Sequence, residues 1–138
     1  MLPFEHRCQL RVRYGETDQM GVVWHGNYIL YFEAARTEAL RACGGSYREL
    51  EAQGVMMPVV DLDLHYVKPA RYDDLLTVVV RVGEPPGARM TFAYEVLNEA
   101  GETLATGHTV LAFVDARTRR PCRPPPELRR LFRRDGGA

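Results

Sequence analysis

The sequence predicts an α+β fold in which an antiparallel sheet curls around a single long helix. An alternating segment at residues 5–14 precedes an apolar helical pattern at residues 27–43, and four strand-like segments follow between residues 56 and 115. Helix and strands segregated in this way along a chain are typical of α+β domains. The turns between the later segments are short, and short connections join antiparallel neighbours.

The first segment, residues 5–14, has the two-residue period of a half-buried strand. Its polar face consists of arginine and glutamine. The face expected in the core carries Cys8, Leu10, Val12 and Tyr14. Residues 15–26 have no sustained period, so this stretch is predicted to be a loop or a single irregular turn.

Residues 27–43 are predicted to form the central core helix, because they carry a broad apolar stripe at helical spacing. The stripe consists of Tyr28, Tyr31, Phe32, Ala35, Ala39, Leu40 and Cys43. Asn27 is the predicted N-cap, since its side chain can accept a hydrogen bond from the free amides of the first turn. Two glycines at positions 44 and 45 are expected to end the helix.

After the helix, the sequence predicts one short helical turn and four strands. Ser46 is the expected cap of a turn within residues 46–53, because Glu49 lies in the capping-box position three residues later. The four strands are expected at residues 56–67, 75–82, 90–98 and 102–115. The segment at 75–82 is apolar on nearly both sides, which is typical of an interior strand.

Composition limits the class of protein. A chain of 138 residues with 46% hydrophobic and 26% charged residues fits one soluble globular domain. No run approaches the roughly 20 apolar residues that span a bilayer, and the residues after Met1 lack the apolar segment of a signal peptide. We therefore expect a cytoplasmic protein without membrane insertion. The balanced formal charge gives no electrostatic reason to expect a nucleic-acid partner.

The three cysteines are expected to be free buried thiols. Cys8, Cys43 and Cys122 are odd in number and widely spaced. This pattern fits a reducing compartment better than a disulfide framework or a zinc site.

The predicted domain spans residues 1–116, and residues 117–138 are predicted to be a tail. The tail contains eight arginines and four prolines. Like charge and proline stiffness favour a solvated or weakly docked segment. A single amphipathic turn could still pack against the domain through Leu128, Leu131 and Phe132.

Several enzyme classes lack their defining residues in this sequence. There is no serine-hydrolase elbow, phosphate-binding glycine loop, HExxH motif or dinucleotide fingerprint. The four histidines have no metal-ligand spacing. The feature that remains is Asp18, a carboxylate in the loop immediately before the predicted helix.

A carboxylate beside a helix N-terminus could hydrolyse an ester-like bond. The free amides can stabilise an oxyanion while Asp18 attacks the substrate or activates water. A thioester suits this arrangement, because a thiolate with a pKa of about 8 to 9 leaves with little help from an acid. An amide would need a proton donor, and the sequence offers no evident one.

Structural roles also account for each of these residues. An aspartate in a glycine-containing loop is commonly a turn former. His25 fits a capping or core residue, and Tyr28 fits a packing residue of the apolar stripe. Glu33 and Arg36 lie three residues apart on the predicted helix, so an ion pair is expected between them.

Two segments closely resemble a known enzyme family. These are YGETDQMGVVWHGNYILYFEAART and HYVKPARYDDLLTV. They are similar to the hotdog-fold acyl-CoA thioesterases of the 4-hydroxybenzoyl-CoA thioesterase and YbgC-like group. The resemblance implies a five-stranded antiparallel sheet wrapped around one long helix, and hydrolysis of an acyl-CoA to a free acid and CoA without any cofactor. It also implies subunits that pair edge to edge, often again into a homotetramer, with active sites between subunits.

The resemblance implies site residues as well. Asp18 would be the nucleophile or the general base, and the backbone amide of His25 would polarise the thioester carbonyl. Arg89 of the neighbouring subunit would contact a CoA phosphate. The other implied substrate contacts are Gly21, Val22, Val23, Trp24, Asn27 and Tyr28. A hotdog dehydratase or hydratase, a non-catalytic acyl-thioester-binding or scaffold protein, and the choice between aliphatic and aromatic acyl groups remain open alternatives.

Overall fold

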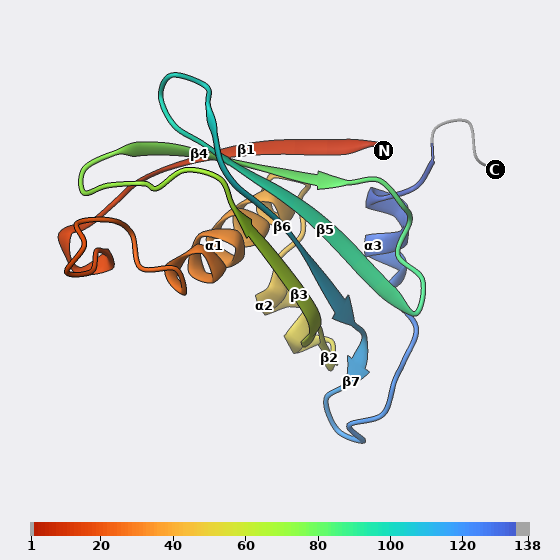
Figure 1. Ribbon diagram of the computed structural model, residues 1–138. Coiled ribbons are helices and arrows are strands. Elements are labelled where there is room, and N and C mark those ends of the chain that lie inside the picture. The colour runs from red at the N-terminus through yellow and green to blue at the C-terminus, as the bar shows by residue number, and fades with distance from the viewer. Residues whose placement is uncertain (1, 135–138) are drawn as a thin grey trace.

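In a computed structural model that describes residues 2–134, five antiparallel strands form one sheet, and the long helix α1 lies across one face of it (Figure 1). The strand order is β1-β4-β5-β6-β3. The strands are β1 (Phe4–Arg11), β3 (Val59–Tyr66), β4 (Leu75–Val82), β5 (Arg89–Leu97) and β6 (Thr103–Ala112). This architecture confirms the predicted α+β hotdog fold.

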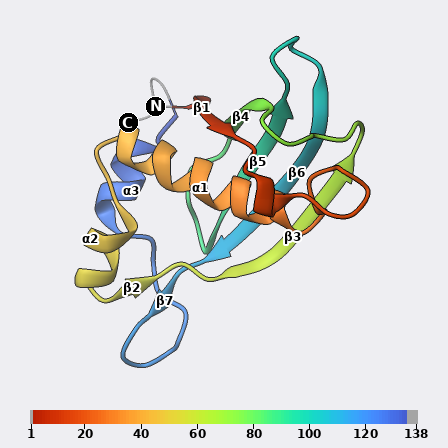
Figure 2. The same ribbon diagram turned by 90° about the vertical axis from the view of Figure 1, so that its left-hand side faces the viewer.

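Smaller elements complete the domain. A two-stranded sheet pairs β2 (Val55–Met56) with β7 (Val114–Asp115), and a 3-10 turn η1 (Tyr14–Glu16) follows β1. The helices are α1 (Asn27–Ala42), α2 (Tyr47–Ala52) and α3 (Pro126–Leu131). The end view in Figure 2 places α2 and α3 beyond one end of α1, and the loop that precedes α1 at the other end.

The core lies between α1 and the sheet, as the apolar stripe predicted. Phe32 is fully buried and stacks on the ring of Tyr94 with the ring centroids 4.3 Å apart. Gly107 on β6 makes this packing possible, because a Cβ there would lie 2.7 Å from the Phe32 ring. The interior strand β4 is buried on both faces at residues 78–80, as its apolar sequence predicted.

The predicted strands needed adjustment at their ends. The segment predicted at 102–115 divides into β6 and β7, and that at 56–67 divides into β2 and β3. The first strand ends at Arg11, and Tyr14 is 77% exposed, so its placement in the core was wrong. Tyr14 lies on η1, where the chain has left the sheet and the two-residue period no longer applies.

Two local predictions for the helices had opposite outcomes. The Ser46 cap is confirmed, because its hydroxyl accepts a hydrogen bond from the Glu49 amide at 3.0 Å. The Asn27 cap was wrong, because Gly26 is the N-cap and the Asn27 side chain donates to the backbone oxygen of Glu16 at 2.8 Å.

The predicted ion pair between Glu33 and Arg36 was also wrong. Arg36 is buried, and its guanidinium donates to the hydroxyls of Tyr47 at 2.7 Å and Tyr94 at 3.1 Å. Glu33 is exposed and forms no ion pair among residues 2–134. Arg36 therefore points into the core, away from the exposed side of α1 that Glu33 occupies.

The arginine-rich segment after residue 116 includes α3, which packs on the domain. Leu128 and Phe132 are each 1% exposed, and the Phe132 ring meets Phe4 of β1 edge-on at 5.3 Å. The Leu2 amide also donates to the backbone oxygen of Arg133 at 2.9 Å. The division into a domain of residues 1–116 and a tail of residues 117–138 stays a prediction, and residues 135–138 lie outside the described range.

The structure tests the expectation of buried cysteine thiols and shows whether any helix is long and apolar enough to cross a membrane. Cys8, Cys43 and Cys122 are free and half-buried, so the expectation of buried thiols was too strong. Burial raises the pKa of the Cys8 and Cys43 thiols. Within the described range, no helix has the length and apolar character needed to cross a bilayer.

Candidate active site

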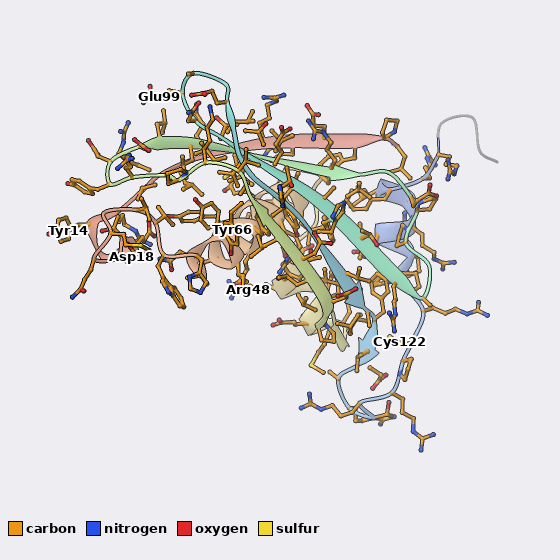
Figure 3. All side chains as sticks on the ribbon, viewed as in Figure 1. Tyr14, Asp18, Arg48, Tyr66, Glu99 and Cys122 are labelled. Atoms are coloured by element: carbon orange, nitrogen blue, oxygen red, sulfur yellow. The ribbon has the colours of Figure 1, made fainter. Side chains whose placement is uncertain are left out.

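A cavity of about 290 Å³ lies where the loop before α1 meets the end of β3. Its lining is mainly apolar, and Asp18 supplies a carboxylate. The lining residues are Asp18, Met20, Val22, Val23 and His25 from the loop, Tyr28 from α1, and residues 66–69 from β3 and the segment after it. Figure 3 labels Asp18 on the loop and Tyr66 at the end of β3.

A tight turn holds the Asp18 carboxylate. The Asp18 amide donates to the oxygen of Val22 at 2.9 Å, and the Gly21 amide donates to the oxygen of Asp18 at 3.0 Å. Gly21 has a φ of 80°, a conformation that favours glycine. The Met20 amide donates to Asp18 Oδ1 at 2.9 Å, whereas Oδ2 accepts from no described residue. Asp18 is thus a turn former with one carboxylate oxygen still available for chemistry.

The backbone oxygen of Glu16 fixes the start of α1. It accepts from the Trp24 amide at 2.9 Å and from Asn27 Nδ2 at 2.8 Å. The Asn27 amide in turn donates to the Trp24 oxygen at 2.9 Å. These bonds set the plane of the peptide that joins Trp24 to His25, because the peptide unit is rigid.

This peptide plane carries the N–H of His25. The C=O and N–H of a trans peptide point in opposite directions. The His25 N–H therefore points away from the Asn27 amide that the Trp24 oxygen accepts. No residue in the described range accepts a hydrogen bond from it. The site thus contains a free backbone donor on a residue that lines the same cavity as Asp18.

The Glu16 side chain ties the loop to α1. Its Oε1 accepts from the Arg13 amide at 2.8 Å and from the Tyr31 hydroxyl at 3.0 Å. Burial, together with the bond to Glu16, raises the pKa of Tyr31 well above its usual value, so the hydroxyl remains a donor. Sequence reasoning did not single out Glu16, although it lies in the quoted motif two residues before Asp18.

Tyr66 is a second contributor that sequence reasoning missed. Its hydroxyl donates to the backbone oxygen of His25 at 2.9 Å, across 41 positions of sequence. Its ring packs edge-on against Tyr28 with centroids 5.3 Å apart. In the sequence it is one position of the strand predicted at residues 56–67. Its place in the motif HYVKPARYDD, which the resemblance had marked, was the available signal.

The structure brings Asp18, Val22, Val23, His25 and Tyr28 together around the cavity. The other four predicted site residues are placed differently. Gly21 shapes the turn, the Asn27 side chain is engaged by Glu16, and the Trp24 ring lies against the His25 ring at 4.8 Å. Arg89 begins β5, at the end of the sheet away from this loop in the same chain (Figure 1). Their substrate-binding roles stay predictions.

The described residues offer no set of side chains that could bind a metal ion. In residues 2–134, no group of three or more His, Cys, Asp or Glu side chains is arranged to hold a metal ion. The polar groups of the residues that line this cavity are the Asp18 carboxylate, the His25 imidazole, the Lys68 amine, two tyrosine hydroxyls and backbone amides.

The fold and this loop define a class of protein. The family model of the thioesterase-like superfamily matches residues 12–132, and the chain belongs to that superfamily. Among its relatives are a putative acyl-CoA thioesterase, YneP, of Bacillus subtilis, 38% identical over 94 residues, and an acyl-CoA thioester hydrolase, YbgC, of Escherichia coli, 31% identical over 122 residues. The first match covers 68% of each chain, and the second covers 88% of this chain and 91% of its relative.

A solved structure supports the same assignment. The DHNA-CoA thioesterase from Staphylococcus aureus has a TM-score of 0.83 and 38% sequence identity, covering 86% of this chain and 80% of its own. These findings confirm the family resemblance read from the two sequence segments.

Proposed function

We propose that this chain hydrolyses an acyl-CoA thioester to a free acid and CoA, with Asp18 as the reacting carboxylate and the His25 amide as the donor to the thioester carbonyl. The observation that carries the proposal is that two residues lining one cavity each have a polar group free of hydrogen bonds within residues 2–134. In the described part of the chain, one carboxylate oxygen of Asp18 has no hydrogen-bond partner, and neither has the backbone N–H of His25. Family membership supports the same reaction class.

The proposed reaction needs only these groups and water. The His25 N–H donates to the carbonyl oxygen and stabilises the negative charge that develops there. Asp18 either attacks the carbonyl carbon and forms an anhydride or removes a proton from an attacking water. The C–S bond then breaks, and CoA leaves as a thiolate. In the anhydride route, water subsequently releases the acid and regenerates the Asp18 carboxylate.

The two routes for Asp18 differ in where an oxygen atom from water ends. In single-turnover hydrolysis in heavy-oxygen water, an anhydride opened at the Asp18 carboxyl carbon leaves label in the enzyme. A general-base route leaves label only in the released acid. Mass spectrometry of the peptide that contains Asp18 measures this difference.

The cavity lining favours an apolar acyl group. Met20, Val22, Val23, Val67 and Pro69 contribute apolar surface to the lining. Such a lining suits aliphatic and aromatic acids alike. A thiol-release assay over short, medium, long and aromatic acyl-CoAs tests the function directly. We expect release from at least one class, and no release from any of them would refute the proposed activity.

The active unit is proposed to be a homo-oligomer, either a dimer or a tetramer built as a dimer of dimers, paired through β3. Among residues 2–134, this edge strand pairs with β6 on one side only, and Val60 and Tyr66 are each 46% exposed. An exposed apolar edge strand is a ready template for pairing with a second copy. In such an assembly, Arg89 of the partner subunit is proposed to contact a CoA phosphate. Light scattering and analytical ultracentrifugation measure the state, and a monomer at working concentration would contradict it.

A further inference from the structure

Tyr66 links the outer edge of the sheet to the turn that begins α1. It is the last residue of β3, it lines the cavity with Asp18, and its hydroxyl donates to the His25 oxygen at 2.9 Å. Burial raises the pKa of this hydroxyl, so it remains a protonated donor at neutral pH. Figure 3 labels Tyr66 and Asp18 on the two segments that border the cavity.

A hydrogen bond from outside the turn restrains its backbone, and this matters because the turn contains the flexible residue Gly26. A Cβ at this position would lie 2.3 Å from the Trp24 ring, so the packed ring leaves no space for a side chain. Glycine is the least restrained residue in its backbone dihedral angles. The peptide between His25 and Gly26 therefore gains little rigidity from its own sequence.

Two hydrogen bonds restrain the peptide planes on either side of His25. The Asn27 amide holds the plane before His25 through the Trp24 oxygen, as described above. The Tyr66 hydroxyl holds the plane after it through the His25 oxygen. Since a residue has only two soft backbone dihedrals between rigid planes, restraining both planes fixes the backbone of His25.

We propose that Tyr66 is a positioning residue, whose hydroxyl fixes the His25 backbone so that its N–H is held ready for the thioester carbonyl. This inference rests on the proposed function, because it assigns a task within the same site. The Tyr66 hydroxyl does not itself meet the reacting atoms. Its effect belongs to the chemical step, since a preorganised donor matters most where charge develops.

The decisive variant is Tyr66→Phe, with Tyr72→Phe as the matched control. Tyr66→Phe removes one hydroxyl and keeps the ring that packs on Tyr28. Tyr72 is 55% exposed, packs its ring edge-on against Tyr14 at 5.4 Å, and has a hydroxyl with no partner in the described range. The two variants therefore delete the same atom inside and outside the candidate site.

For Tyr66→Phe we expect kcat to fall about fivefold to tenfold, the effect of losing one ordinary hydrogen bond at the transition state. KM should stay within about twofold, and so should the inhibition constant of an S-alkyl-CoA thioether, which has no carbonyl to activate. Tyr72→Phe should match the wild type. A kcat for Tyr66→Phe equal to that of the wild type, a rise in KM alone, or an equal loss in Tyr72→Phe would overturn the inference.

A wild-type protein that released no thiol from any acyl-CoA would instead refute the proposed function. The hydrogen bond can be tested without turnover by carbonyl ¹³C labelling of histidine in the intact protein. The His25 signal, assigned by its loss in His25→Gln, should shift in Tyr66→Phe, while those of His6 and His108, which are distant from residue 66 in sequence, stay in place. An unchanged His25 signal would overturn the inference even if Tyr66→Phe were less stable.

Discussion

At the scale of single residues, the contact between Trp24 and Gly26 determines how the loop enters α1. Trp24 is half exposed, and its ring occupies the space that a side chain at Gly26 would need. The same ring lies against that of His25. The backbone at Gly26 has a φ of −69°, which alanine adopts freely, so any effect of adding a methyl group there comes from the ring contact.

We predict that Gly26→Ala displaces the Trp24 ring toward water and lowers thiol release severalfold. Trp24 is the only tryptophan, so a red shift of the emission maximum reports this movement directly. Gly87→Ala is the control, because a Cβ there would meet no atom of the described residues within 4 Å. An emission spectrum of Gly26→Ala identical to that of the wild type would contradict the packing described here.

The sequence predicted which residues lie around the cavity better than it predicted their hydrogen-bond partners. Asparagine is one of the residue types preferred at an N-cap, but this preference reflects only hydrogen bonds to the next few residues of the chain. The amide of Asn27 instead reaches the backbone of Glu16, eleven residues earlier, because the loop folds back over the helix start. A contact of that kind depends on the path of the whole loop and is absent from local preferences.

At the scale of elements, a buried polar network joins α1, α2 and the sheet. Arg36 on α1 donates to Tyr47 and Tyr94, and Tyr94 lies 2.6 Å from the Thr109 hydroxyl on β6. Burial raises the pKa of Tyr47 to about 12. Both tyrosines thus remain protonated at neutral pH, and the network holds a buried cation through their hydroxyls and through the Tyr47 ring, whose centroid lies 5.8 Å from Arg36 Cζ.

We predict that Tyr94→Phe lowers the free energy of unfolding by about 1–3 kcal/mol, because Arg36 and Thr109 each lose a buried partner. Urea denaturation measures the change, and an unchanged slope would show that the folded state remains compact. The exposed hydroxyl of Tyr72 provides the comparison, with a change of less than about 0.5 kcal/mol expected for Tyr72→Phe. A loss this small in Tyr94→Phe would mean that the network contributes little.

The apolar stripe of α1 was predictable because a helix that covers a sheet must repeat its buried face every three to four residues. The role of Arg36 was not. Its spacing from Glu33 indicated a surface pair, since such pairs stabilise isolated helices. Only the positions of Tyr47 and Tyr94, which are distant in sequence, turn Arg36 into a core residue.

At the scale of the whole molecule, the arginine-rich C-terminal segment contributes to the fold. Phe132 lies four residues after Leu128, both are buried, and Phe132 meets the first strand at Phe4. Neighbouring arginines of α3 remain exposed. The high charge of this segment favoured a solvated tail in the sequence analysis, because composition averages over the two faces of a short helix.

We predict that Phe132→Ala costs about 3–5 kcal/mol of stability, the usual loss for a large buried aromatic side chain. Arg133→Ala, which changes an exposed neighbour, should alter stability by less than about 0.5 kcal/mol. Thermal and urea unfolding of the two variants provide the comparison. If the segment were only weakly docked, the two substitutions would have similarly small effects.

The central claim is that Asp18 performs the chemistry of thioester hydrolysis, and Asp18→Asn tests it most directly. Asparagine keeps the shape of the side chain and an oxygen that can accept from the Met20 amide, but it loses the reactive charge. Asp73→Asn is the matched control, since Asp73 does not line the cavity and has a φ of 69°, which asparagine tolerates.

With an acyl-CoA that the wild type hydrolyses, thiol release by folded Asp18→Asn should fall at least about a hundredfold, the usual effect of losing a catalytic base or nucleophile. Affinity for the S-alkyl-CoA thioether should change little, and Asp73→Asn should turn over like the wild type. Turnover by Asp18→Asn close to that of the wild type would contradict the account.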